Sequence, residues 1–328
     1  MLDKLAGLYA IIPTPAKPDA GKLLATDTVD LDETVRVVEA LIKDGASGLI
    51  TLGTTGECAT LSQPDYERFV TCVLETVRRR IPTLIGTTAL GGHEVAARMK
   101  FIRDRGADGT LLGLPIWQPL TMKEAVDWYA SMSEAFQRLA VMVYANQRAF
   151  RFDFSSLDFW EAVAKQAPTV TSAKMSRPKD LVELIRRTKG RVNFVPNEST
   201  LHTTYKLSPE TTTACWATAA AMGPGPALAI MNAVKSGDQN KIDLYAKAIA
   251  WSGAPVDALI KDPEVFAKFN IQIEKIRIGA AGYCKPGPMR PPYNDIPAEM
   301  AEAARECGRR WAELCKVGPE TVLSRLAA

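Results

Sequence analysis

Residues 140–174 have the sequence AVMVYANQRAFRFDFSSLDFWEAVAKQAPTVTSAK, and this stretch decides the fold. Two short runs rich in apolar residues, Val141–Tyr144 and Val170–Lys174, lie on either side of a segment with helical period, Leu157–Ala167. A strand, a helix and a second strand in this order are typical of parallel strands joined by a crossover helix. The first run is apolar throughout, as expected for a strand buried on both faces.

The same alternation extends along the chain in both directions. The other strand-like runs are Leu8–Pro13, Gly48–Leu52, Thr83–Thr87, Gly109–Leu114, Val192–Val195 and Thr211–Ala217. The helical stretches between them are Leu31–Asp44, Pro64–Arg80, His93–Arg105, Lys123–Arg138 and Lys179–Lys189, with a weaker one at Glu198–Lys206. Eight strands without a long break favour an α/β fold of the closed (β/α)8 TIM-barrel kind over an open doubly wound sheet.

The chain of 328 residues is longer than such a barrel requires, since a barrel takes roughly 250 residues. We therefore expect a catalytic barrel domain at residues 1–236 and a helical extension at 237–328 that packs on it. A helix at Ala227–Lys235 follows Gly223–Pro226, and the later helical segments are Lys241–Trp251, Pro263–Tyr283 and Pro297–Lys316. The stretch Cys284–Pro297 is dense in Pro and Gly, and we expect an ordered connection or a subunit contact there.

Composition excludes several classes of function. The net charge is only +3, and the basic clusters at 78–80 and 186–187 end helical stretches without interleaved aromatic residues, so we expect no nucleic-acid partner. Six scattered cysteines without a CxxC pair indicate reduced thiols and a cytoplasmic location. With only two histidines, far apart, we expect neither a metal site nor a Ser-His-Asp triad. We expect neither a signal peptide at the N-terminus nor a membrane-spanning segment, because no long apolar run follows a basic segment and no window of about 20 apolar residues occurs.

Lys174 ends one of the predicted strands, and the active site of a (β/α)8 barrel lies at the carboxyl ends of its strands. A lysine beside apolar walls has a lowered pKa, and its neutral amine can attack a ketone to give an imine. Tyr144 ends the preceding strand, so its phenol can reach Lys174 and shuttle protons. The alternatives are a surface lysine just past a strand and a packed aromatic side chain.

Gly53-Thr54-Thr55-Gly56-Glu57 follows the second predicted strand. The glycines permit a tight turn, and the exposed amides and Thr hydroxyls form a nest for a carboxylate. Glu57 is interpreted as the cap of the next helix. Cys58 beside it is not expected to be a nucleophile, because no histidine is near.

These features together resemble the dihydrodipicolinate synthase / N-acetylneuraminate lyase superfamily of pyruvate-dependent class I aldolases, over about residues 5–235. GTTGE, Tyr144 and Lys174 match its motifs in order and spacing. One branch, the aromatic hydratase-aldolases, is similar over nearly the whole length. The stretches similar to that branch are IIPTP, TVDLDET, GECATL, GTTAL, YANQRAFRFDF, KFNIQIEK and AGYCKPGPMRPPYN.

The resemblance implies roles by position. Lys174 would form the Schiff base, Tyr144 would relay protons, and Thr54 and Thr55, in the turn with Gly53 and Gly56, would hold the pyruvyl carboxylate. Trp216 and Asn270 would face the aromatic end of the substrate. The resemblance also implies a homotetramer without a cofactor, acting on a small aromatic α-keto acid and releasing pyruvate.

The chain departs from the synthase branch at two places. Trp117 lies near the place of a tyrosine after the fourth strand, and Tyr144-Ala145-Asn146-Gln147 replaces the usual Tyr-Asn-x-Pro. Both departures argue against lysine-biosynthetic and sialic-acid activity, and Trp117 is assigned to the barrel mouth or to the core. Asn197 stands where a histidine is expected in the hydroxybenzylidene enzymes, which changes the partner of the ortho substituent.

The resemblance implies hydration and retro-aldol cleavage of an ortho-substituted benzylidenepyruvate. Arg148 and Arg177 follow the strands of Tyr144 and Lys174, and either could pair with an ortho carboxylate. The sequence thus leans towards 2'-carboxybenzalpyruvate, from phenanthrene breakdown. The o-hydroxy substrate of naphthalene breakdown stays open, as do two solvent-facing arginines.

Two other interpretations remain open. One is a different pyruvate aldolase or dehydratase of the superfamily, acting on a sugar-derived keto acid; Trp117, Trp216 and Phe150 argue against the polar mouth that this would need. The other is a non-catalytic barrel used for binding, whose usual mark would be loss of the lysine.

Overall fold

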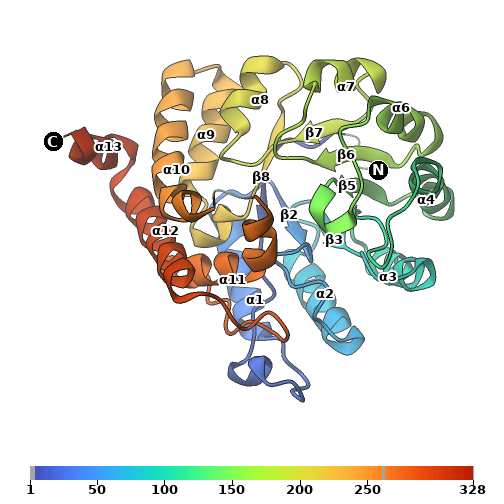
Figure 1. The fold of residues 1–328 in the computed structure, drawn as a ribbon, viewed down its shortest axis with the longest axis horizontal. Coiled ribbons are helices and arrows are strands. Elements are labelled where there is room, and N and C mark those ends of the chain that lie inside the picture. Colours follow the sequence, from blue (N-terminus) through green and yellow to red (C-terminus); the bar gives the residue numbers. More distant parts are fainter. Residues whose placement is uncertain (1–3, 261–262, 328) are drawn as a thin grey trace.

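The computed structural model describes residues 4–260 and 263–327. Within them, parallel strands form one sheet in the order β7-β6-β5-β4-β3-β2-β1-β8. The strands are β1 (Gly7–Ile11), β2 (Gly48–Thr51), β3 (Thr83–Gly86), β4 (Gly109–Leu112), β5 (Ala140–Tyr144), β6 (Val170–Lys174), β7 (Asn193–Val195) and β8 (Ala214–Ala217). A parallel bridge between Asn197 and Trp216 joins the two ends of the sheet into a nearly closed barrel (Figure 1). The predicted (β/α)8 barrel is confirmed.

Helices alternate with the strands around the barrel (Figure 1). They are α1 (Leu31–Lys43), α2 (Gln63–Val77), α3 (Gly92–Asp104), α4 (Met122–Ala135), α6 (Leu157–Gln166), α7 (Leu181–Arg187), α8 (Leu201–Leu207) and α9 (Gly225–Ser236). Short polar side chains cap several of their first turns: Asp30, Ser62, Thr121 and Ser156 each accept a backbone N–H three residues later. The sequence analysis did not predict the single-turn helix α5 (Gln147–Phe150) or the 3-10 turns η1 (Pro18–Gly21) and η2 (Ala219–Met222).

The strands form the core because their side chains are buried on both faces. All five residues of β5 are buried, and so are all residues of β1, β2, β3, β4 and β8. Lys174 at the end of β6 is the partly exposed exception in its strand. The strands are apolar throughout for this reason. Helices cover their outward-facing side chains, and their inward-facing side chains fill the barrel.

The C-terminal helices pack on one side of the barrel (Figure 1). They are α10 (Gln239–Leu259), α11 (Pro263–Ala281), α12 (Ala298–Val317) and α13 (Pro319–Ala327). Ile249 of α10 and Trp311 of α12 belong to the same apolar cluster as the barrel strands. Helix α11 is kinked at Phe269 and contacts α5, which follows β5, so it crosses near the carboxyl ends of the strands.

Candidate active site

Lys174 and Tyr144 are direct neighbours at the carboxyl ends of β6 and β5, where their Cα atoms are register partners. The Nζ atom of Lys174 lies 4.7 Å from the centroid of the Tyr144 ring and 3.4 Å from that of Trp216. Burial between these rings disfavours the ammonium form and lowers the pKa of Lys174 to about 7, although Glu274 and Glu198 act in the opposite direction. A large fraction of the amine is therefore neutral near pH 7.

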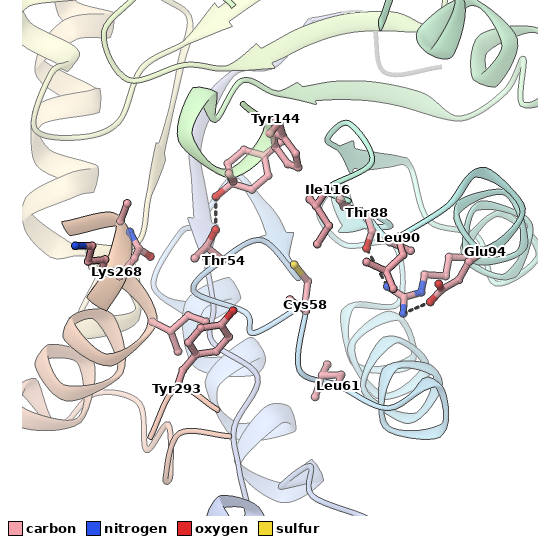
Figure 2. Close-up of a pocket in the computed structure, with 18 of the residues that line it drawn as sticks. Thr54, Cys58, Leu61, Thr88, Leu90, Glu94, Ile116, Tyr144, Lys268 and Tyr293 are labelled. Atoms are coloured by element: carbon pink, nitrogen blue, oxygen red, sulfur yellow. Dashed lines mark hydrogen bonds and ion pairs between the residues drawn. The ribbon is translucent and has the colours of Figure 1, made fainter. Parts of the chain in front are cut away.

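The hydroxyl of Tyr144 is held on the side facing the turn after β2. It shares a hydrogen bond of 2.8 Å with Oγ1 of Thr54 (Figure 2). Nδ2 of Asn146 donates to it at 3.4 Å. The ring of Phe150 packs edge-on at a centroid distance of 5.6 Å. Burial raises the pKa of Tyr144, so the phenol keeps its proton and can pass it to a neighbour.

The turn Gly53–Glu57 follows β2 and has an unexpected backbone. The positive φ angles are at Leu52 (55°) and Glu57 (54°), not at the two glycines. Gly56 is needed for close packing instead, because a Cβ there would lie 2.6 Å from the backbone nitrogen of Leu52. Thr55 is buried within the turn.

The sequence predicted Glu57 as the cap of α2. In the structure Ser62 occupies the cap position instead. The carboxylate of Glu57 is fully buried and accepts from Nζ of Lys275 at 2.7 Å and from Nη1 of Arg290 at 2.6 Å. The backbone N–H of Arg290 donates to its other oxygen at 2.8 Å. The prediction was wrong because the partners of Glu57 are far away in sequence: Lys275 lies in α11, and Arg290 lies in the loop between α11 and α12.

A cavity of about 880 Å³ opens beside Lys174. It brings together five of the predicted site residues, which are Lys174, Tyr144, Trp216, Asn270 and Arg148, and also Arg177. Phe152, Phe154 and Phe266 add further aromatic walls. A second cavity of about 550 Å³ lies on the other side of Tyr144 and Asn270 and is bordered by Thr54 and Cys58 (Figure 2). Burial raises the pKa of Cys58 to about 11, which disfavours a nucleophilic thiolate.

Two of the predicted site residues, Trp117 and Asn197, do not line either cavity. The side chain of Trp117 is 79% exposed, so core packing is excluded for it, while its neighbour Ile116 borders the second cavity. Asn197 pairs with Trp216 through the backbone, and its Oδ1 accepts from the backbone nitrogen of Thr200 at 3.1 Å. Arg148 and Arg177 are exposed at the outer rim of the larger cavity.

The sequence analysis missed two buried carboxyl groups near Lys174. Glu274 lies four residues after Asn270 on α11 and forms an ion pair of 2.7 Å with Arg277. Glu198 follows β7 by three residues and is also buried. Its place after a strand end could have marked Glu198 as a candidate, whereas α11 was placed at the barrel mouth only by the family resemblance, through Asn270.

Within the described residues, no cluster of His, Cys, Asp and Glu side chains is arranged to hold a metal ion. In the same part of the chain, no helix is long and apolar enough to cross a membrane.

Comparisons with known proteins agree with this geometry. The model of the Dihydrodipicolinate synthetase family matches residues 20–172. Trans-O-hydroxybenzylidenepyruvate hydratase-aldolase of Pseudomonas putida is 37% identical over 95% of this chain and 94% of its own. Trans-2'-carboxybenzalpyruvate hydratase-aldolase of Nocardioides sp. (strain KP7) is 34% identical over 94% and 93%. The solved structure of PhdJ bound to a substrate intermediate is 32% identical, with a TM-score of 0.91 over 96% of this chain and 98% of that one.

The barrel and these relatives define a class I aldolase, a carbon–carbon lyase of the hydratase-aldolase type. The chain belongs to the dihydrodipicolinate synthetase family. The resemblance inferred from the sequence is thereby confirmed, and it includes the C-terminal helices, which the relatives share.

Proposed function

We propose that Lys174 forms a Schiff base with the ketone of an aromatic α-keto acid and that this adduct carries both hydration and aldol cleavage. The observation that carries the proposal is the position of the Lys174 amine between two aromatic rings, 3.4 Å from the Trp216 ring centroid and 4.7 Å from that of Tyr144. Since burial favours the neutral amine, Lys174 can act as a nucleophile near pH 7.

The pyruvyl carboxylate is assigned to the turn Gly53–Glu57. Thr54 already binds the Tyr144 hydroxyl, so a carboxylate at this turn would lie within reach of both the relay and the backbone amides. The remainder of the substrate would extend into the larger cavity, where Phe152, Phe154 and Trp216 can surround an aryl ring. This arrangement supports an aromatic substrate over a sugar-derived keto acid.

The chemistry follows from the electron demand of the iminium. The Lys174 nitrogen adds to the ketone and water leaves, which gives a cation conjugated to the alkene. A water molecule then adds to the benzylic carbon, and its extra proton returns to the adduct as the enamine carbon is protonated. Tyr144 next takes up the proton of the new hydroxyl as it passes its own proton towards Thr54, and the C–C bond breaks towards the iminium and releases the aldehyde. Protonation and hydrolysis of the remaining enamine release pyruvate.

We infer that the ortho substituent is a hydroxyl. Glu274 and Glu198 are buried carboxyl groups that interact with Lys174, and Glu274 lies one helical turn beyond Asn270. A hydroxyl can donate to either acid, whereas an ortho carboxylate buried beside them would lose its hydration. The hydratase-aldolase of Pseudomonas putida, at 37% identity, is named for the hydroxy compound.

The second candidate is 2'-carboxybenzalpyruvate, towards which the sequence leans. Arg148 and Arg177 both border the larger cavity, and a guanidinium can bind a carboxylate with two hydrogen bonds. Both side chains are exposed at the rim, where solvent weakens such a pairing. The relative from Nocardioides is named for this carboxy compound.

Steady-state kinetics with both compounds distinguish the candidates. We expect kcat/KM for trans-o-hydroxybenzylidenepyruvate to exceed that for the 2'-carboxy compound by about tenfold or more, because an ortho carboxylate buried beside these acids loses its hydration. Release of pyruvate and of the aromatic aldehyde would be measured, with the para-hydroxy isomer as a matched control. A higher kcat/KM for the carboxy compound would contradict the assignment and would favour the rim arginines.

A further inference from the structure

Glu198 is a buried acid beside the lysine, and the mechanism above gives it no role. Its side chain is 6% exposed, and Oε2 has no hydrogen-bond partner among the described residues. The loop that carries it is fixed on both sides. Asn197 bridges to Trp216 on β8, and Oγ1 of Thr200 donates to the carbonyl of Ser176, just after Lys174, at 2.6 Å.

The strand register brings this loop to Lys174. Val195, the last residue of β7, is the Cα register partner of Lys174 on β6. Trp216 connects the same elements, because its Nε1 donates to the carbonyl of Val195 at 3.0 Å while Nζ of Lys174 lies over its ring. Glu198 therefore follows directly on the strand end that faces the lysine.

Besides Lys174, three other titratable groups interact with Glu198. Arg277 and Glu274, both on α11, form an ion pair with each other and so balance their charges. Cys215 on β8 is buried, and burial raises its pKa, so it stays neutral. Glu198 therefore interacts with two cations, Arg277 and Lys174. Arg277 already has Glu274 as its ion-pair partner, whereas Lys174 forms no ion pair among the described residues, so Lys174 is the cation that Glu198 can balance.

We propose that Glu198 is the counter-ion of the iminium at Lys174 and supplies the proton that its formation consumes; this rests on the proposed Schiff base. Because it protonates the departing hydroxyl, Glu198 acts as a catalytic acid in this step. An isolated buried cation is costly, so the partner that receives the opposite charge stabilises the adduct.

The step balances in atoms and charge. The neutral amine of Lys174 adds to the ketone carbon, so a C–N bond forms and the oxygen becomes a hydroxyl. That hydroxyl takes up the proton of the neutral Glu198 carboxylic acid, the C–O bond breaks, and water leaves. The products are an iminium cation and a carboxylate, so the net charge of the pair stays zero. Hydrolysis returns the proton to Glu198.

The electrostatics of the pair support this exchange. Burial lowers the pKa of Lys174 to about 7 and raises the pKa of Glu198 to about 7. When the two values coincide, the neutral amine with the neutral acid and the ammonium with the carboxylate are close in free energy, and they titrate as one unit.

The test is the pH dependence of covalent trapping by borohydride with pyruvate, in the wild type and in Glu198→Gln. In the wild type we expect trapping to fall as the pH drops through about 7, because Lys174 becomes protonated. Removing the carboxylate removes an interaction that raises the pKa of Lys174. The fall in trapping at low pH, the acid limb of the profile, should therefore lie about one pH unit lower in Glu198→Gln than in the wild type. The amount of adduct trapped at high pH, the plateau of the profile, should be about tenfold lower in Glu198→Gln, because the iminium loses the same interaction.

Two controls separate charge from structure. Glu198→Asp keeps the acid on a shorter side chain, and its acid limb should lie between those of the wild type and Glu198→Gln. Glu210→Gln makes the same change at an exposed position after α8 and should match the wild type. Glu198→Gln should also keep its thermal midpoint, because it removes a buried carboxyl oxygen that has no partner.

The outcomes are distinct. A wild type that turns over substrate without trapping overturns the Schiff base itself and with it the role of Glu198. A wild type that traps at Lys174, with a Glu198→Gln limb and plateau that coincide with the wild-type values, overturns only the role of Glu198. A lower plateau with an unmoved acid limb in Glu198→Gln also overturns the role of Glu198, because it indicates a structural defect.

Discussion

Lys174→Met is expected to abolish C–C cleavage while the barrel stays folded. The amine is the protein nucleophile of the mechanism, and loss of a nucleophile from a coupled site costs about 10⁴-fold or more in kcat. Methionine has a similar length and no charge, so it can occupy the space between Tyr144 and Trp216. Lys174 pairs with Val195 through its backbone at the end of β6, so a change of its side chain leaves the strand register in place.

The measurement is kcat with trans-o-hydroxybenzylidenepyruvate, together with circular dichroism and the thermal midpoint. Lys165→Met on α6 is a matched control, because it removes an exposed lysine outside the cavity and should leave kcat unchanged. If Lys174→Met retained more than a few per cent of the wild-type kcat, the nucleophile would have to be another group.

Glu57→Gln is expected to lower the free energy of unfolding by about 3–5 kcal/mol, the usual cost of removing one partner of a buried ion pair. The amide would leave Lys275 and Arg290 as two buried cations without a counter-charge. Arg290 also binds the backbone carbonyls of Thr14 and Thr28, so the N-terminal and C-terminal segments would both lose their connection to the turn.

Denaturant unfolding would measure this change, since its midpoint and slope give the free energy. Glu302→Gln is the matched control: Glu302 is exposed on α12 and pairs with Arg305 and Arg309, and its loss should not change stability measurably. A Glu57→Gln variant as stable as the wild type would mean that the turn is held by packing alone. In that case Lys275 and Arg290 would have no role in positioning it.

The fold could be predicted from the sequence because its strands are buried on both faces. A run such as Ala140–Tyr144 must be apolar throughout when helices cover one side and the barrel interior the other, so the strand is visible locally. The places of Lys174 and Tyr144 followed from the same fact, since neighbouring strand ends meet at one rim.

The remaining features depend on contacts between distant residues. Glu57 meets Lys275 and Arg290 across 218 and 233 positions, and nothing in the local sequence of the turn indicates these partners. The positive φ angles lie at Leu52 and Glu57, whereas Gly56 serves close packing, and the two glycines of the motif indicate neither. The place of Trp117 could not be predicted either, because a loop aromatic gives no sign of whether it is covered.

The most direct test of the account is to locate the covalent adduct. The wild-type chain would be incubated with pyruvate and borohydride at pH 8, digested, and analysed by mass spectrometry. We predict one reduced pyruvyl group per chain, on the peptide that contains Lys174, and none in Lys174→Met. An active wild-type enzyme whose Lys174 stays unmodified, or an adduct on a different lysine, would contradict the account.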